Sequence, residues 1–435
     1  MRSEKIAEKI MTQVHEGVKD FISEIIANHR TVDFGKIEEK VQELSRRFSR
    51  QLAEEALEAV GNGYVGRTIE CECGGFMEYR GDNRWLLTSL SGKLEIHRAY
   101  YYCKDCGSSK VPLDEQLCLE GKHQSIGVRK CIALVGMVEG FQEASRHLQE
   151  LTGVSVSAKE EQMESEEIGK EVGSQEDAQV EAFWSEEKDI SAEVTARRFY
   201  ITADGVMVRT GKDTHNEAKI GSVYETPLAR EAIAGDIRYT GGFYQSEDFG
   251  KRLYILALRR GLKTAVEVVF LGDGSQWIWN IARYHFPEAV QIVDWYHAEE
   301  RLWSVGRIVY GEGTSAMKKW VKNRLKQLAK GKVESIISSL SKLSSTNPDV
   351  TEEIEDNITY FTNNKERMRY KEYREKGYHI GSGVVESACK HVVGQRLKQA
   401  GMTWSIEGAN AIIQLRILWK NGEWHKFWSN RKVAG

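Results

Sequence analysis

Three apolar, strand-like runs in the second half of the chain each lead into an aspartate. The runs read FYITADG, VEVVFLGDG and VQIVDWYH, and their aspartates are Asp204, Asp273 and Asp294. Helix-like segments precede the second and third runs. Strands that alternate with helices favour a mixed α/β sheet with helices on its faces. Because a strand backbone is rigid, an acid at a strand end is fixed in place and faces outward.

A fourth acidic residue, Glu386, follows the glycines of IGSGVVES at the start of a helix-like segment. We expect Asp204, Asp273 and Glu386 to meet in space. Carboxylates that converge from different elements make a hard-oxygen site for Mg²⁺ or Mn²⁺, and two such ions can clamp both reacting oxygens of a phosphodiester. The pattern therefore predicts metal-dependent chemistry on nucleic acid. Spacing alone leaves open a second assignment, in which Asp294 replaces Asp273 as a metal ligand.

The composition of the 435-residue chain limits the remaining classes of protein. It contains no run of 18 uncharged apolar residues and no signal-peptide pattern, so we expect a cytoplasmic protein with no membrane partner. The formal net charge of −3 excludes a uniformly basic nucleic-acid binder. Charge is uneven, however, because residues 160–189 are strongly acidic and residues 318–332 carry seven lysines and arginines. A local basic run of this kind can bind phosphates.

The chain divides into six segments by its changes of pattern. Two helices with apolar stripes come first, and because a hairpin cannot bury both stripes alone, we expect it to pack on the body or on another subunit. The predicted segments are a helical hairpin (1–63), a zinc-binding β-ribbon (64–118), a helical segment (119–192), the first part of an α/β core (193–300), an all-helical insertion (301–378) and the second part of the core with a tail (379–435).

Two pairs of cysteines lie in the predicted β-ribbon: Cys71 and Cys73 in CECGG, and Cys103 and Cys106 in CKDCG. In a cytosolic chain this pattern predicts one tetrahedral structural Zn²⁺ in preference to disulfides. The first pair is C-x-C where C-x₂-C is commoner, so four ordinary buried cysteines remain the alternative. The other thiols lie in apolar or helical surroundings and are interpreted as structural; they are Cys118, Cys131 and Cys389.

The helical segment contains a candidate helix-turn-helix. A helix-like run ends at Gly153, and Ser157 with Glu160 forms a capping box for the next helix. This is the spacing of a DNA-reading helix pair. The second helix carries five glutamates between residues 160 and 167, which repel phosphate, so a plain hairpin that joins two domains is the alternative. If the pair binds DNA, we expect its loop and Arg146 to make the contacts.

Four sequence blocks carry a resemblance to a known family: ADG at 203–205, VFLGDGSQWIWNIA at 269–282, IVDWYHAEERLW at 292–303 and GSGVVESACKHVVGQRLKQAGMTW at 381–404. On these blocks the chain resembles bacterial insertion-sequence transposases of the ISKra type, in the Mutator-like group of DDE transposases. The resemblance implies an RNase H-like α/β catalytic core with a long all-α insertion. It also implies that Asp204, Asp273 and Glu386 are the acidic triad, and that Asp294 and His297 form an Asp-x-x-His element that supports the site or contacts the cleaved strand.

By this resemblance the expected activity is metal-dependent cleavage and transfer of DNA strands at insertion-sequence ends. We expect two Mg²⁺ (or Mn²⁺) ions per active site, double-stranded DNA with terminal inverted repeats and target DNA as partners, and a homodimer or higher oligomer. The residues expected to contact DNA phosphates are Lys318, Lys319, Lys322, Arg324, Lys326, Arg396 and Lys398.

Val206 departs from the family pattern, because a small polar residue commonly stands there. A transposase-derived DNA-binding regulator without catalytic activity is therefore the alternative function. A zinc-stabilised interaction scaffold, whose carboxylates are solvated turn residues, is the third class. Trp320, within the basic run, either stacks on a splayed base or fills the core of the insertion; we favour the core.

Overall fold

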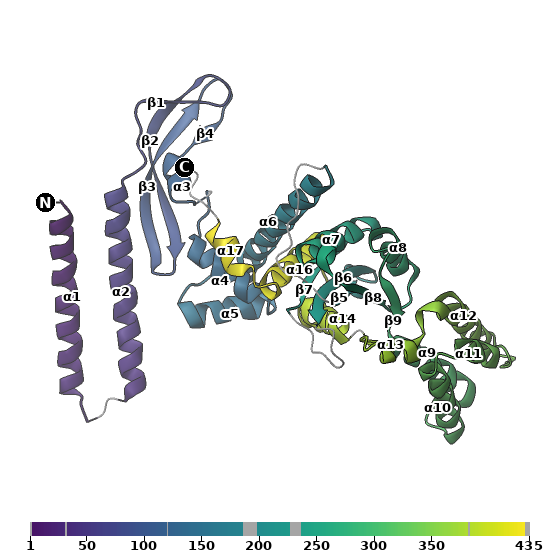
Figure 1. The fold of residues 1–435 in the computed structure, drawn as a ribbon. Helices are drawn as coiled ribbons and strands as arrows, with labels where there is room; N and C mark the ends of the chain where they lie inside the picture. The colour runs from purple at the N-terminus through teal and green to yellow at the C-terminus, as the bar shows by residue number, and fades with distance from the viewer. Residues whose placement is uncertain are drawn as a thin grey trace. The chain divides into compact units, whose positions relative to one another are not determined.

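The computed structural model describes residues 2–30, 33–119, 121–185, 198–226, 236–381 and 383–430. The chain separates into two compact units (Figure 1). The first comprises Met1–Ser165 with His425–Gly435, and the second comprises Glu166–Trp424. Helices and strands occur in both, which confirms the predicted mixed α/β class. None of the helices in these ranges combines the length and apolarity that crossing a bilayer requires.

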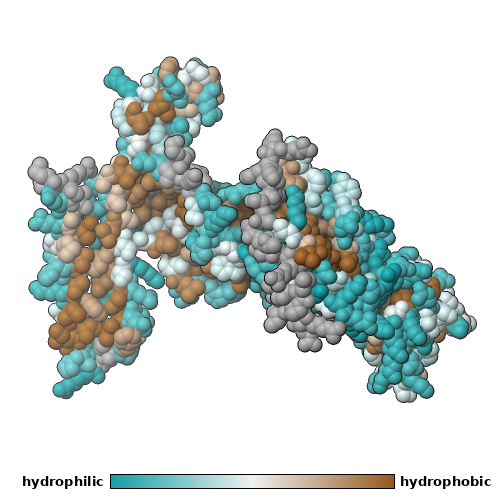
Figure 2. Space-filling view, viewed as in Figure 1, coloured by the Kyte–Doolittle hydropathy of each residue, from teal (hydrophilic) through white to brown (hydrophobic). Residues whose placement is uncertain are grey.

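The first unit begins with the two predicted helices, α1 (Arg2–Ala27) and α2 (Phe34–Val60). Asp33 caps α2, because its carboxylate accepts a hydrogen bond from the backbone N–H of Lys36. No residue of α2 is buried, and Met11 and Leu52 are 65% and 53% exposed. Figure 2 shows apolar side chains gathered along these two helices. The hairpin therefore leaves much of its apolar stripe open to solvent.

A four-stranded antiparallel sheet follows, in the order β1-β2-β3-β4. Long β2 and β3 form a hairpin with a register shift between Tyr79 and Gly81, and a small core that includes Met77 and Tyr101 lies against it. The strands are β1 (Thr68–Glu70), β2 (Phe76–Ser89), β3 (Gly92–Cys103) and β4 (Ser109–Lys110).

The helix pair around Gly153 confirms the predicted turn. Gly153 ends the first helix in the left-handed conformation, with φ +74°, and Ser157 caps the second. The Glu160 carboxylate accepts a hydrogen bond from the Ser157 backbone N–H at 2.8 Å, which completes the capping box. The remaining helices that lie wholly or partly in the first unit are α3 (Pro112–Gln116), α4 (Ile126–Gly136), α5 (Phe141–Thr152), α6 (Ala158–Trp184) and, from the C-terminal part of the chain, α17 (Trp424–Ser429).

The second unit is built on a five-stranded mixed sheet in the order β7-β6-β5-β8-β9. Its first strand, β5, pairs antiparallel with β6 and parallel with β8, and β9 is also parallel to β8. Apolar residues of β5 and β8, among them Phe199 and Leu271, are fully buried in the main core. The strands are β5 (Arg198–Arg209), β6 (His215–Thr226), β7 (Arg238–Gly242), β8 (Glu267–Gly272) and β9 (Val290–Val293).

Helices surround and extend this sheet. Helices α7 (Ser246–Arg259) and α8 (Gln276–His285) alternate with the later strands, as predicted, and a 3₁₀ turn spans Leu262–Thr264. The predicted all-helical stretch is confirmed, with a second 3₁₀ turn at Lys365–Arg367. Its helices are α9 (Trp295–Tyr310), α10 (Ser315–Ala329), α11 (Val333–Leu340), α12 (Pro348–Asn364) and α13 (Tyr370–Glu375).

The last part of the unit is helical from Gly383 to Leu397, within the segment IGSGVVESACKHVVGQRLKQ (380–399) that its pattern predicts as a core helix, but the helix changes type along its length. That stretch is α14 (Gly383–Ala388), a π-helical segment (Cys389–Gly394) and a short α15 (Gln395–Leu397). A further helix, α16 (Ile406–Lys420), follows, and ten of its residues are buried. Because α16 is apolar on nearly every side, it lacks the one-sided stripe by which amphipathic helices are recognised.

Candidate functional site

The three predicted aspartates are aligned on neighbouring parallel strands. Ala203 of β5 pairs with Gly272 of β8, and Gly272 pairs with Val293 of β9. Asp204, Asp273 and Asp294 each follow their paired residue by one position. Neighbouring strands are about 4.8 Å apart. The backbones of the three aspartates therefore lie side by side, at the same level along the strand direction. One prediction needs correction: β5 does not end at Asp204 but continues along β6 to Arg209.

Asp204 is half-buried beside Asp273. Burial is the main cause that raises the pKa of the Asp204 carboxyl, and the negative charge of Asp273 raises it further. The Gly205 backbone N–H, which donates to Asp204 Oδ1 at 2.8 Å, and His297 act in the opposite direction. The Cys389 thiol donates to Asp204 Oδ2 at 3.5 Å. Because burial and Asp273 both disfavour a bare negative charge at Asp204, a positive charge bound beside this carboxylate would be stabilised.

Asp273 is held by its own turn. The backbone N–H of Ser275 donates to Asp273 Oδ1 at 2.7 Å, and the Ser275 hydroxyl donates to Oδ2 at 2.9 Å. The hydroxyl of Tyr360 in α12 donates to the Asp273 backbone carbonyl at 2.8 Å. Gly274 has φ +107°, and a Cβ there would lie 2.4 Å from the Tyr360 ring. A glycine is therefore required for α12 to approach this turn.

Asp294 and His297 form one structural element at the start of α9. Asp294 is fully buried and caps the helix, because its Oδ1 accepts a hydrogen bond from the His297 backbone N–H at 2.9 Å. The same oxygen lies 3.3 Å from His297 Nδ1. Asp294 raises the pKa of His297 most, burial lowers it, and Asp204 and Asp273 raise it further. The imidazole is therefore within electrostatic range of all three aspartates.

The Glu386 carboxylate lies close to Asp294 and His297. The three members of the predicted triad, Asp204, Asp273 and Glu386, do not lie equally close to one another. Asp294, His297 and Glu386 each offer a ligand atom, and these atoms all lie within 4.8 Å of one another. Among the described residues, Asp204, Asp273 and Glu386 do not form such a group. The reason is local: Gly205 and Ser275 hold the first two carboxylates within their own turns. Glu386 is exposed on the short α14.

The thiol of Cys389, interpreted above as structural, lies beside the acidic edge of the sheet. It is buried at the start of the π-helical segment, and its thiol contacts Asp204. Burial raises the pKa of this thiol well above its usual range, and the charge of Asp204 contributes. π-Helical segments occur often at functional sites. The only signal in the sequence is the position of Cys389 three residues after Glu386, nearly one helical turn.

The predicted DNA-contacting residues fall into two groups. Lys398 is exposed after α15, whereas Arg396 is fully buried with its guanidinium 4.8 Å from the centre of the Trp404 ring. The prediction that Arg396 contacts phosphate is therefore wrong, because its charge faces the interior. On α10, Arg324 is half-buried over Trp320, and Trp320 packs on the main core, as favoured above. The exposed lysines of α10 are Lys318, Lys319, Lys322 and Lys326.

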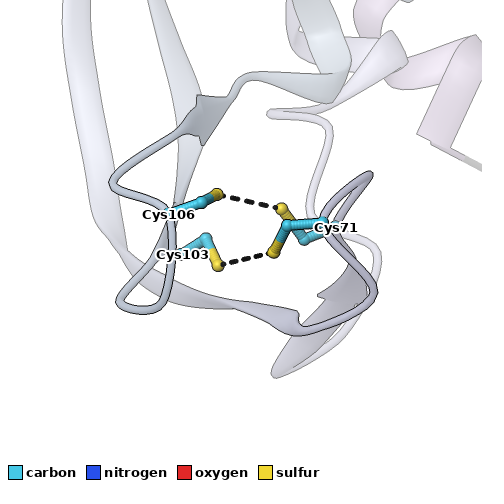
Figure 3. Close-up of side chains that lie close together, drawn as sticks. Cys71, Cys103 and Cys106 are labelled. Atoms are coloured by element: carbon cyan, nitrogen blue, oxygen red, sulfur yellow. Dashed lines mark hydrogen bonds between the residues drawn. The ribbon is translucent and has the colours of Figure 1, made fainter.

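A second group of ligand-type residues lies in the first unit, where the four predicted cysteines meet (Figure 3). The Sγ atoms of Cys71 and Cys106 are 3.5 Å apart, and those of Cys73 and Cys103 are 3.7 Å apart. Sulfurs on a tetrahedral ion with bonds of ~2.3 Å lie about 3.8 Å apart. The four thiols are therefore spaced to share one metal ion.

The surroundings favour the thiolate form at Cys71 and Cys106, whereas the pKa of Cys73, which the Gly75 backbone lowers and hydrogen bonds to the other cysteines raise, is raised to about 12. The Ser108 hydroxyl lies 2.9 Å from Cys106 Sγ and is the main cause that lowers the pKa of Cys106 to about 6. The backbone N–H of Cys73 is the main cause that lowers the pKa of Cys71. Thiolate is the form that binds a metal.

The fold and these two groups define a mixed α/β protein with two candidate metal-binding clusters. The chain belongs to the UPF0236 family, an uncharacterised protein family whose model matches residues 27–432. It is similar to "UPF0236 protein in vanSb 3'region" of Streptococcus gallolyticus, with 23% identity over 358 residues that cover 79% of this chain and 74% of the relative. Neither description assigns an activity.

Proposed function

We propose that this protein is a DDE-type DNA transposase, which cleaves and transfers DNA strands at the ends of an insertion sequence. The observation that carries the proposal is the level alignment of Asp204, Asp273 and Asp294, with Glu386 beside Asp294 and His297. The strand order supports an RNase H-like core, in which the first strand of the sheet pairs with the fourth; here β5 pairs with β8. The resemblance to ISKra-type transposases supports the same reading.

The acidic edge fits divalent cations by its chemistry. The half-buried Asp204 and Asp273 offer hard oxygen ligands, and their mutual repulsion disfavours two bare carboxylates. When bound, Mg²⁺ or Mn²⁺ supplies positive charge that activates a water or 3′-hydroxyl and stabilises the leaving oxygen. The residues of the chain hold the ligands in place: Gly205 and Ser275 orient the two carboxylates. Glu386 on the exposed α14 completes the proposed triad.

Asp294 is assigned a positioning role, and Asp273 the role of metal ligand. The Asp294 carboxylate is fully buried, caps α9 and pairs with His297. The Asp273 side chain is half-buried and follows the end of β8. A fully buried carboxylate that caps a helix is less accessible to an ion than a half-buried carboxylate that follows a strand. The competing assignment, with Asp294 as a ligand, is supported by the Asp294–His297–Glu386 group.

DNA is held by phosphate contacts in this proposal. The exposed lysines of α10 are available to neutralise phosphates, and such binding weakens steeply as salt is added. Lys398 is exposed, and its charge lowers the pKa of Cys389, the thiol that contacts Asp204, so it is suited to orient the scissile phosphate. The open apolar stripe of α1 and α2 fits association into a homodimer or higher oligomer.

The cysteine cluster is proposed to hold one structural Zn²⁺ in a β-ribbon. Thiolate ligands suit Zn²⁺, and four protein ligands leave no open position for catalysis. Such an ion fixes Cys71, next to β1, to Cys103 at the end of β3. Its contribution is therefore to folding of the first unit.

A strand-cleavage assay tests the proposed activity. The substrate is labelled duplex DNA that carries the repeats flanking the coding region, with Mg²⁺ or Mn²⁺. We expect wild-type cleavage, and a loss of at least about 10³-fold in Asp204→Asn and Asp273→Asn. Glu288→Gln, an exposed acid outside the site, is the matched control and keeps full activity. DNA binding without cleavage by the wild type would contradict the enzyme proposal and favour the regulator.

A further inference from the structure

A cavity of about 470 Å³ lies in the first unit, where three segments far apart in the sequence meet. Its walls are the middle of α2, the turn between β2 and β3, and the turn after α5 at Gly153. None of its lining residues belongs to the cysteine cluster or has a role in the proposed function.

The lining of this cavity is basic. Arg46, Arg47 and Arg50 project from α2, and Lys93 comes from the start of β3. Among the lining residues that the structure describes, none is acidic. Two acids act from outside the lining: Glu54 lies 3.7 Å from Arg50, and the charge of Glu160 interacts with Lys93. Four cations against two anions leave an excess of positive charge.

Two of the arginines have uncommitted donors. Within the described ranges, no hydrogen bond or ion pair holds the guanidinium of Arg46 or Arg47, and both residues are exposed. The Arg46 guanidinium lies against the α5 turn, since a Cβ on Gly153 would be 2.8 Å from its Nη1. The partial negative charge at the C-terminus of α5 favours one cation there. That attraction does not account for Arg47, Arg50 and Lys93.

Helix α6, which follows the turn, repels phosphate less strongly than its five glutamates indicate. Of the five glutamates near the start of α6, Glu161 is fully buried and Glu164 is 7% exposed. Glu164 forms a buried ion pair with Arg129. These two charges are therefore directed into the first unit and not toward DNA.

We propose that this cavity binds backbone phosphates of duplex DNA and so holds the substrate of the proposed transposase. The inference rests on the proposed function, which it deepens by assigning a second DNA-binding surface. Guanidinium groups donate paired hydrogen bonds to phosphate oxygens, and the hydroxyls of Ser91 and Ser155 add neutral donors. Contacts of this kind position a duplex and carry no base specificity.

Binding of labelled duplex DNA to the full-length protein, followed by fluorescence anisotropy, tests this site. Arg46→Gln/Arg47→Gln is compared with Lys19→Gln/Arg30→Gln, which removes the same charge from exposed positions outside the cavity. We expect the cavity variant to bind about tenfold more weakly or worse, with a log–log salt slope shallower by about 1.8, since each phosphate contact contributes about 0.9. The control changes affinity less than about twofold. Arg46→Lys/Arg47→Lys keeps the charge and should retain most of the affinity.

The possible outcomes distinguish a failure of the cavity proposal from a failure of the proposed function. If the wild type binds duplex DNA and cleaves it while Arg46→Gln/Arg47→Gln binds equally well, the cavity proposal is overturned and the transposase stands. If the wild type binds no duplex, both are overturned. Unchanged DNA binding with lost binding to vesicles of anionic phospholipid would reassign the cavity to a membrane surface. Thermal unfolding and zinc content equal to the wild type show that a weaker variant is still folded.

Discussion

One oxygen of Asp294, Oδ1, contacts two atoms of His297: it accepts a hydrogen bond from the backbone N–H at 2.9 Å and lies 3.3 Å from the ring nitrogen Nδ1. The Asp-x-x-His spacing is thus the spacing of a helix N-cap, in which the capping residue meets the third residue of the helix. One buried carboxylate fixes both the start of α9 and the position of the imidazole beside the other acids.

This relationship predicts different consequences for two neighbouring aspartates. Asp294→Ala removes the cap of α9 and should lower the free energy of unfolding by about 1–2 kcal/mol. Asp273→Ala removes a half-buried carboxylate outside the core and should lower it by less than about 1 kcal/mol, while cleavage is lost. Urea unfolding and the strand-cleavage assay measure the two effects. Full cleavage by Asp273→Ala would transfer the ligand role to Asp294.

The turn after β8 predicts a strong glycine requirement. Gly274→Ala places a Cβ at φ +107° and 2.4 Å from the Tyr360 ring, and should destabilise the protein by about 1–3 kcal/mol. Gly383→Ala is the matched control, because nothing lies within 4 Å of its added Cβ and it is in a helix. The control should be neutral or slightly stabilising. Equal thermal unfolding of both variants would refute this account of the turn.

His285 predicts a loss of stability in acid. Burial is the main cause that lowers the pKa of His285 to about 4, with Lys251 contributing and Glu247 opposing. The unfolded chain, with a histidine pKa of about 6.5, therefore binds more protons than the folded chain between these values, and stability falls as pH drops from about 6.5 to about 4. At pH 5 the loss should be about 1–2 kcal/mol, allowing for solvent screening.

Urea unfolding of wild type and His285→Gln at pH 7.5 and pH 5 isolates this contribution. The variant has no imidazole to titrate, so it should lose less stability than the wild type between the two pH values. An equal loss in both proteins would show that other groups cause the acid sensitivity.

The cysteine cluster predicts one bound zinc per chain. Cys73→Ser should reduce zinc, measured by elemental analysis, from about one per chain to well below half, because three thiolates bind the ion more weakly. Cys131→Ser is the control, since Cys131 is half-buried outside the cluster. Wild-type protein without zinc would contradict the proposal directly.

Features carried by local pattern were predictable from the sequence, and those that depend on tertiary packing were not. The aspartates that directly follow β8 and β9, the Ser157–Glu160 capping box and the clustered cysteines follow from periodicity and residue type. The burial of Arg396 under Trp404 depends on how α15 packs, so charge alone placed it wrongly at a DNA surface. The contact of Cys389 with Asp204 depends on a π-helical segment, which has no distinctive sequence pattern.

The proposed function depends on one divalent-metal site, formed by Asp204 of β5, Asp273 directly after β8, and Glu386. Calorimetric titration of zinc-loaded protein with Mn²⁺ tests it most directly, with Asp204→Asn/Asp273→Asn compared with Glu288→Gln. We predict that wild type and Glu288→Gln bind Mn²⁺ alike and that the double variant shows at least a tenfold weaker affinity. Identical titration curves for all three proteins would contradict the account.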